Sequence, residues 1–204
     1  MIWRRLPLAT IALAASAIAV ALIPALQRAL VLDRDAVAAG ELWRIATGSL
    51  VHFSTSHLLY DLAVVIVASA LLERRGWPVA PIVLASATAI GAAVLLFTPE
   101  IARYGGLSGV ASSLVALYAV DCLTVRGAAR AAAVLVLVLT AIKLGWELSS
   151  GTFVFVGDAG DAFRPVPLAH IVGAGVGIAA FFLSRAHRVP NGAPTLVVSE
   201  RAPA

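Results

Sequence analysis

Six runs of apolar residues, each approaching the length needed to cross a bilayer, dominate this chain of 204 residues. The hydrocarbon core of a membrane is about 30 Å thick, and a helix that rises about 1.5 Å per residue crosses it in roughly 20 residues. The runs are Leu6–Leu26, His57–Leu72, Val79–Phe97, Leu107–Val125, Ala131–Trp146 and Leu168–Leu183. They predict an all-α, polytopic membrane protein with six transmembrane helices.

The composition agrees with a membrane protein and not with a soluble one. Apolar residues make up 61% of the chain, charged residues make up only 13%, and the mean hydropathy is +0.97. The net charge of +4 comes from arginines that stand singly or in pairs between the apolar runs, which does not indicate nucleic-acid binding. Cys122 is the single cysteine of the sequence, which excludes an intramolecular disulfide and a multi-cysteine metal site.

The arginines also predict the orientation of the helices. With a cytoplasmic N-terminus, the inner side holds Arg4, Arg5, Arg74, Arg75, Arg126, Arg130, Arg185, Arg188 and Arg201. Because positive residues favour cytoplasmic loops, both termini are expected in the cytoplasm. A cleavable signal peptide is the alternative interpretation of Leu6–Leu26. We expect residues 1–188 to form one transmembrane domain and residues 189–204 to be a disordered tail.

Two long connections, Gln27–Ser56 and Leu148–Pro167, face outward in this orientation. Connections of this length are uncommon unless they have a function. The apolar residues Leu42, Trp43 and Ile45 suggest short helical pieces at the membrane interface within the first connection.

Polar and reactive residues gather near the outer ends of three apolar runs. The second, fourth and sixth runs all pass from outside to inside, so their N-terminal ends lie at one depth. Near these ends stand His57 and Asp61, Ser108, and His170. Ionisable groups inside a membrane are costly and usually face an interior or a wet cavity. Four residues from three helices therefore indicate a functional site.

Ser108 is the candidate nucleophile of this site. A serine hydroxyl becomes reactive when an adjacent base accepts its proton, and an imidazole is suited to that role near neutral pH. Gly173 and Gly177 share a helix face with His170, and such small residues favour close packing on a neighbouring helix. If that neighbour carries Ser108, the imidazole of His170 meets the hydroxyl. The sequence shows no acidic third member for a catalytic triad.

Glycines flank this serine in the motif that ends at Gly109. Gly106 and Gly109 would let the backbone approach a substrate carbonyl, and the unpaired N–H groups at a helix start can bind an oxyanion. Tight helix packing is the alternative interpretation of the same glycines.

These motifs together resemble the rhomboid family of intramembrane serine proteases. The resemblance covers residues 6–188 and rests on Trp43-Arg44, on the run from His52 to Asp61, on Gly106-Leu107-Ser108-Gly109, and on Ala169-His170 with Gly173 and Gly177. It implies a bundle of six helices, with Ser108 as the nucleophile and His170 as the general base of a Ser-His dyad. It also implies that His57 donates to the oxyanion, assisted by the backbone N–H groups of Leu107 and Ser108.

Within the family, the segment Val166–His170 and the acid Asp61 are most similar to the bacterial rhombosortase branch. That branch is associated with envelope substrates that carry a C-terminal glycine-rich sorting tail. The resemblance therefore implies a transmembrane or C-terminally anchored protein substrate.

Two positions depart from the pattern of the family. Asp61 stands where the family usually has an asparagine that donates to the oxyanion, so a direct role requires a protonated carboxyl; otherwise Asp61 orients His57 and favours its imidazolium. Ser112 stands where many relatives have an aromatic residue that packs on the catalytic histidine. The orientation of that histidine is then expected to come from Tyr104, Trp146 or a loop residue.

The expected reaction is hydrolysis of a peptide bond through an acyl-enzyme on Ser108. One alternative is a membrane acyltransferase that uses His57-x-x-x-Asp61 as its base, with Ser108 structural. Another is a catalytically inactive rhomboid-like binding protein. No cofactor and no metal are expected, because His52, His57 and His170 are irregularly spaced and no H-E-x-x-H motif is present. The expected partners are the substrate and the lipid bilayer, with no nucleic acid, and the sequence leaves the oligomeric state open.

Overall fold

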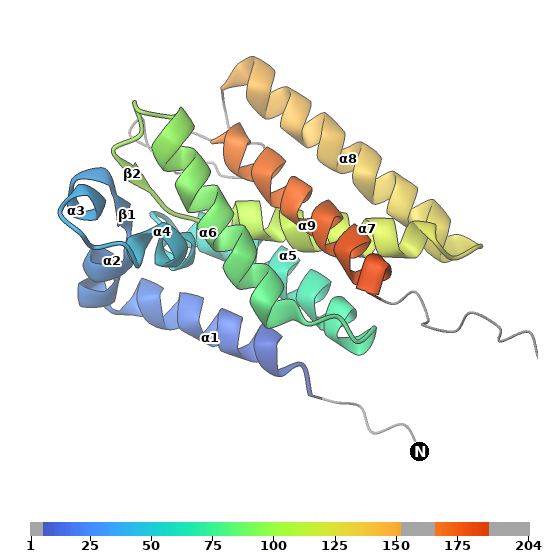
Figure 1. Cartoon of the computed structure of the whole chain (residues 1–204). Helices are drawn as coiled ribbons and strands as arrows, with labels where there is room; N and C mark the ends of the chain where they lie inside the picture. Colours follow the sequence, from blue (N-terminus) through green and yellow to red (C-terminus); the bar gives the residue numbers. More distant parts are fainter. Residues whose placement is uncertain (1–5, 152–165, 188–204) are drawn as a thin grey trace, which may run out of the picture.

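The computed structural model describes residues 6–151 and 166–187 of the chain, and this part is a bundle of long helices (Figure 1). The long helices are α1 (Leu8–Leu22), α5 (Thr55–Arg74), α6 (Val79–Phe97), α7 (Ser108–Leu123), α8 (Ala128–Ser150) and α9 (Pro167–His187). The short elements are α2 (Pro24–Leu30), β1 (Leu32–Asp33), α3 (Arg34–Ala38), α4 (Arg44–Thr47), the 3-10 turn η1 (Gly48–Leu50) and β2 (Arg103–Tyr104). In Figure 1, α1 and α8 lie at opposite edges of the bundle, and α2, α3, α4 and β1 gather at one end.

Four of the described helices, α5, α6, α8 and α9, are long and apolar enough to cross a membrane, and the bent pair α1 and α2 would make a fifth. The prediction of a multi-pass helical membrane protein is confirmed, whereas the count of six spans is not. The fourth predicted span is too short to cross a bilayer as a straight helix, because α7 has 16 residues and rises only about 24 Å. α7 is apolar because it is the central helix, in contact with α5, α6, α8 and α9.

The prediction of one continuous helix over Leu6–Leu26 is wrong. α1 ends at Leu22, and α2 begins at Pro24 with its axis turned by 109°. Proline has no N–H to continue the helical ladder and its ring clashes with the preceding turn, but it fits the first position of a new helix.

The start of α1 is fixed to the end of α5. The backbone N–H groups of Ala9 and Thr10 each donate to the carboxylate of Glu73 over 3.0 Å. A helix start leaves such donors without intrahelical acceptors, and a negative charge is favourable there. α1 therefore belongs to the folded bundle.

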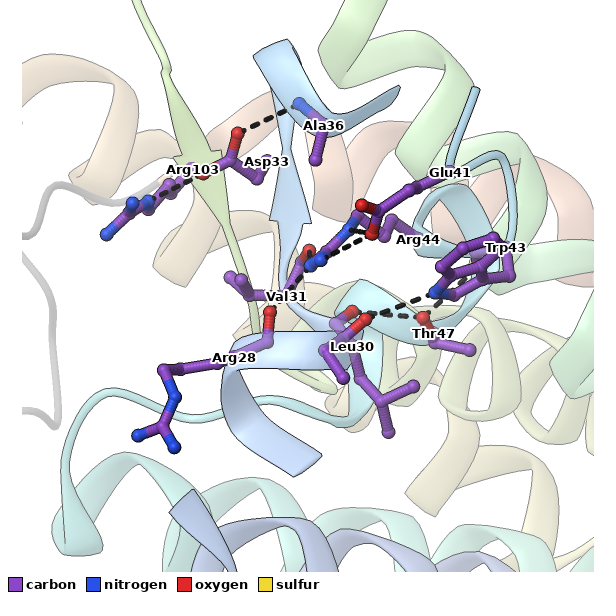
Figure 2. A network of polar contacts seen from close by, with 11 residues as sticks. Arg28, Leu30, Val31, Asp33, Ala36, Glu41, Trp43, Arg44, Thr47 and Arg103 are labelled. Atoms are coloured by element: carbon purple, nitrogen blue, oxygen red, sulfur yellow. Dashed lines mark hydrogen bonds and ion pairs between the residues drawn. The ribbon is translucent and has the colours of Figure 1, made fainter. Parts of the chain in front are cut away.

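The connection between α1 and α5 is built around a buried arginine (Figure 2). The guanidinium of Arg44 donates to the carbonyls of Arg28 and Val31 over 2.7 and 2.9 Å, and it pairs with Glu41 at 2.6 Å. Next to it, the indole N–H of Trp43 donates to a backbone carbonyl of α2 over 3.1 Å. The Trp43-Arg44 motif therefore holds together the short helical pieces that the sequence predicts here.

A two-residue antiparallel ladder joins this connection to the segment that precedes α7. Leu32 pairs with Tyr104 and Asp33 pairs with Arg103, whose Nε donates to the Asp33 carboxylate over 2.8 Å (Figure 2). The Arg103 guanidinium holds the pKa of the Asp33 carboxyl below its ordinary value. The backbone that leads into Ser108 is thus fixed to a folded loop.

α7 and α9 approach each other closely along their glycine faces. A Cβ built on Gly173 would lie 2.0 Å from the carbonyl oxygen of Gly109, and one on Gly177 would lie 2.1 Å from that of Ser113. Only glycine fits at such separations. The predicted small-residue face of α9 therefore packs on the helix that carries Ser108.

Some expectations concern residues outside the described part. The tail 189–204, residues 152–165 of the second long connection, and the terminal arginines Arg4, Arg5, Arg188 and Arg201 that support the orientation all lie there. The domain boundary at residue 188 and the cytoplasmic termini accordingly stay predictions.

Candidate active site

Ser108 is the first residue of α7 and is half-buried. The chain reaches it through Gly106, whose φ of +129° favours glycine. A Cβ on Gly106 would lie 2.7 Å from Cε1 and 3.0 Å from Nε2 of the His57 ring. The backbone before Ser108 therefore lies directly against the imidazole of His57, and the first N–H groups of α7 have no intrahelical acceptors.

His170 lies one turn before Gly173 on α9 and is 7% exposed. The contact between Gly173 and Gly109 fixes the position of α9 along the axis of α7. The carbonyl of Ala169 lies beside Gly109, where a Cβ would be 2.9 Å from its oxygen. Close glycine packing thus brings the imidazole to the start of the helix that Ser108 opens.

The serine and the two histidines line the same two cavities. One cavity, of about 430 Å³, lies between α5, α7, α8 and α9 and is also lined by Asp61, Ser112, Lys143 and Glu147. The other, of about 740 Å³, extends toward β1, β2 and the loop after α6. Both are large enough to accommodate part of a ligand or an unwound peptide. Ser108, His57 and His170 therefore face space that a substrate can occupy.

Asp61 lies between two imidazoles. Its Oδ2 is 3.1 Å from Nε2 of His52 and 3.3 Å from Nε2 of His57. Nδ1 of His52 is 3.2 Å from the carbonyl oxygen of Leu50, so the proton of a neutral ring resides on Nδ1, because a carbonyl only accepts.

The backbone N–H of Leu107 donates to the same Nε2 of His52 over 3.3 Å. An acceptor role requires an unprotonated Nε2, whose single lone pair serves one donor at a time. The Leu107 N–H, expected as an oxyanion donor, is therefore directed at His52 in this structure.

Glu147 is the residue that sequence reasoning missed. It is 2% exposed, its Oε1 lies 2.6 Å from Nζ of Lys143, and its Oε2 lies 3.0 Å from Nδ1 of His170. The sequence suggested no acidic partner for His170, and we expected Tyr104, Trp146 or a loop residue to orient it. The available signal was an acid and a lysine four residues apart on an apolar helix.

The remaining predicted site residues have other positions. Tyr104 lines the larger cavity, and burial raises the pKa of its hydroxyl. Trp146 is 57% exposed on α8. Trp43 and Arg44 stabilise the connection after α1, and within the described residues they line neither cavity.

The family model of the rhomboid domain matches residues 39–187, which contain every candidate site residue described above. The chain belongs to the rhomboid family. No curated protein matches the chain. In this rhomboid, α1, α2 and α3 precede the matched segment, while α4 to α9 and the whole lining of the smaller cavity lie within it. Asp33, Arg34 and Asp35 line the larger cavity from outside the matched segment. The family predicted from the motifs is confirmed, and the apolar helices agree with a membrane protein that acts on membrane substrates.

Proposed function

We propose that this rhomboid is an intramembrane serine protease in which Ser108 is the nucleophile and His170 is the general base. The observation that carries the proposal is that Ser108, His57 and His170, from three separate helices, line the same cavities. A serine and an imidazole that face one cavity supply the two groups that acyl transfer requires.

The reaction proceeds in two halves. His170 Nε2 accepts the proton of the Ser108 hydroxyl as Oγ attacks the scissile carbonyl, whose electron pair moves to its oxygen. The C–N bond then breaks as the same proton passes to the leaving amine, and water hydrolyses the acyl-enzyme by the reverse sequence. No cofactor takes part.

The oxyanion is held by His57 and by the first N–H groups of α7. The loop at Gly106 keeps the His57 ring against the start of the helix. A neutral Asp61 does not repel a developing negative charge, whereas an ionised carboxylate in this position would. The contacts of Asp61 with His52 and His57 hold its carboxyl beside the imidazole that donates to the oxyanion.

The substrate in this proposal is a transmembrane or C-terminally anchored envelope protein. We assign the chain to the rhombosortase branch on Asp61 and the segment Val166–His170, with substrates that carry a glycine-rich C-terminal tail. The protease lies in the bacterial inner membrane with both termini cytoplasmic, which places the candidate site toward the outer side. The many exposed apolar side chains of α8 support its contact with lipid.

A fluorophosphonate probe, which reacts with activated serines, tests the proposal in detergent-solubilised full-length protein. Labelling is expected in the wild type, and it should be lost in both Ser108→Ala and His170→Ala. Ser112→Ala is the matched control, because Ser112 lines the same cavity one turn further along α7, and it should label normally.

The same experiment separates the alternatives. Labelling that survives Ser108→Ala would exclude this serine as the nucleophile and leave the acyltransferase with His57 and Asp61 as its base. Absence of labelling in folded wild-type protein would favour the inactive binding protein. Proteomics of shed envelope proteins in a strain that lacks the protein would then identify substrates of an active protease.

A further inference from the structure

A buried carboxylate on an otherwise exposed helix contacts the candidate base. Of the described residues of α8, only Ala133 and Glu147 are buried. A carboxylate among apolar helices is costly unless it is paired, and such groups usually serve a function. Glu147 meets this requirement with one partner on each oxygen, Lys143 on Oε1 and His170 on Oε2.

The contact engages one particular nitrogen of the imidazole. His170 Nδ1 is 3.0 Å from Glu147 Oε2, although no donor among the described residues is aligned well enough on Oε2 for a hydrogen bond. In a hydrogen bond between these two atoms, Nδ1–H is the donor. Because a carboxylate only accepts, the proton of the neutral ring then resides on Nδ1, and Nε2 presents its lone pair to the cavity that Ser108 also lines.

Lys143 supplies the second half of the arrangement. Its ammonium lies 2.6 Å from Glu147 Oε1, and its side chain is 33% exposed while that of Glu147 is 1% exposed. A neighbouring positive charge favours the ionised form of a buried carboxyl. The lysine therefore keeps Glu147 as a carboxylate, the form that accepts from Nδ1–H.

We propose that Glu147 is a positioning residue that turns the Ser108–His170 dyad of this rhomboid into a Ser-His-Glu triad. The inference rests on the proposed function. Glu147 holds the Nδ1–H tautomer and stabilises the imidazolium that forms when the Ser108 proton moves to Nε2, and it remains ionised throughout the reaction. It also supplies the orientation that an aromatic residue at the position of Ser112 would otherwise give.

The test is the rate of fluorophosphonate labelling between pH 5 and pH 9, per amount of folded full-length protein in detergent. The titratable groups that line the smaller cavity with His170 are Lys143 and Glu147 on α8 and His57, Tyr60 and Asp61 on α5. The larger cavity adds Tyr104 and the charged residues Asp33, Arg34, Asp35, Glu100 and Arg103. Glu147→Gln should lower the plateau rate on the order of 10²–10⁴-fold, as for loss of the acid in other triads. The midpoint of the pH profile should move to lower pH, because the imidazolium loses its carboxylate partner.

Two further variants control the experiment. Glu147→Asp should recover part of the rate and return the midpoint toward the wild-type value. Trp146→Phe changes the exposed residue that precedes Glu147 on α8 and should leave the labelling rate and the midpoint unchanged. A solely structural glutamate would alter the yield or melting temperature of the protein but leave the rate per folded molecule and the midpoint as they were.

The two proposals fail in distinguishable ways. Wild-type labelling at Ser108 together with a wild-type rate and midpoint in Glu147→Gln overturns the triad and leaves the protease intact. Absence of any labelling in folded wild-type protein overturns the protease itself. If Glu147→Gln does not fold, the Glu147→Asp profile decides, and a rate and midpoint equal to those of the wild type overturn the triad.

Discussion

Gly173 on α9 packs against the carbonyl of Gly109, the residue that follows the candidate nucleophile; a Cβ at position 173 would lie 2.0 Å from that oxygen. Gly173→Ala must therefore push the two helices apart, and we expect a loss of about 1–3 kcal/mol in the free energy of unfolding. Probe labelling should fall with it, because His170 moves away from Ser108. Thermal unfolding in detergent and the labelling rate measure the two effects.

Gly175→Ala is the matched control for this substitution. Gly175 lies on the same helix, and a Cβ there would meet no described atom within 4 Å. Because alanine is the better helix former, this variant should be as stable as the wild type or slightly more so. Equal effects of the two substitutions would show that the close contact with α7 is not required.

Gly106 combines a positive φ with contact to the His57 ring, and Gly106→Ala separates these two effects when compared with Gly76→Ala. Gly76 also has a positive φ, of +81°, but a Cβ there would meet no described atom within 4 Å. Both variants should lose about 1 kcal/mol of stability through backbone strain. Only Gly106→Ala should lose labelling, as its Cβ displaces the His57 ring. Full labelling in Gly106→Ala would contradict the role of this loop in holding His57.

Asp61 differs from His57 in its expected contribution to the reaction. Asp61→Asn places an uncharged group of similar shape between His52 and His57, so its labelling rate should stay within about tenfold of the wild type. His57→Ala removes a donor to the oxyanion and should cost on the order of 10²–10³-fold. Steady-state cleavage of an anchored reporter protein gives the same comparison. Equal and complete loss in both variants would mean that the carboxylate itself takes part in the chemistry.

Arg44 stabilises the connection after α1 and, within the described residues, lines neither cavity. Arg44→Met leaves the buried carbonyl of Val31 and the partly buried carbonyl of Arg28 without their donor, which should lower the free energy of unfolding by about 1–3 kcal/mol. Labelling per folded molecule should change little. Arg28→Gln alters an exposed side chain of the same connection and serves as the control, with no change in stability expected.

The ion pair between Asp33 and Arg103 should make a small, acid-sensitive contribution to stability. The pKa of Asp33 in the folded protein is below the ordinary 3.8, so the stabilisation is complete above that pH and is lost as the pH falls through the lower, folded-state value. The pair is partly exposed and contributes less than about 1 kcal/mol. Asp33→Asn keeps the cap of α3 and removes only the charge.

The measurement for this pair is thermal stability at several pH values. The difference in Tm between the wild type and Asp33→Asn should be largest near pH 6 and shrink toward pH 3. A difference that does not depend on pH would mean that the aspartate acts through its hydrogen bonds alone.

The long helices and the close packing of α9 on α7 could be predicted because their causes are local in sequence. The length of an apolar run predicts the length of its helix, and α6 has the predicted bounds Val79–Phe97. The glycine spacing after His170 marks a face that can only pack closely, and α7 is the helix that it meets. The break at Pro24 could also have been predicted, since a proline within a helical run interrupts the helix.

Glu147 shows where prediction from sequence reaches its limit. Its contact with His170 depends on how α8 lies beside α9, and no periodicity in either helix specifies that. The carbonyl contacts of Arg44 are similar, because the acceptors belong to backbone whose path is set by the fold. Side chains that bind across elements are therefore the part of the site that required the structure.

Peptide mass spectrometry of the fluorophosphonate-labelled protein tests whether Ser108 is the nucleophile. One adduct is expected, on the peptide that carries Ser108, formed in the wild type and in Ser112→Ala and absent in His170→Ala. An adduct on Ser112 or on any other serine, or an adduct on Ser108 that forms at the wild-type rate without His170, would contradict it.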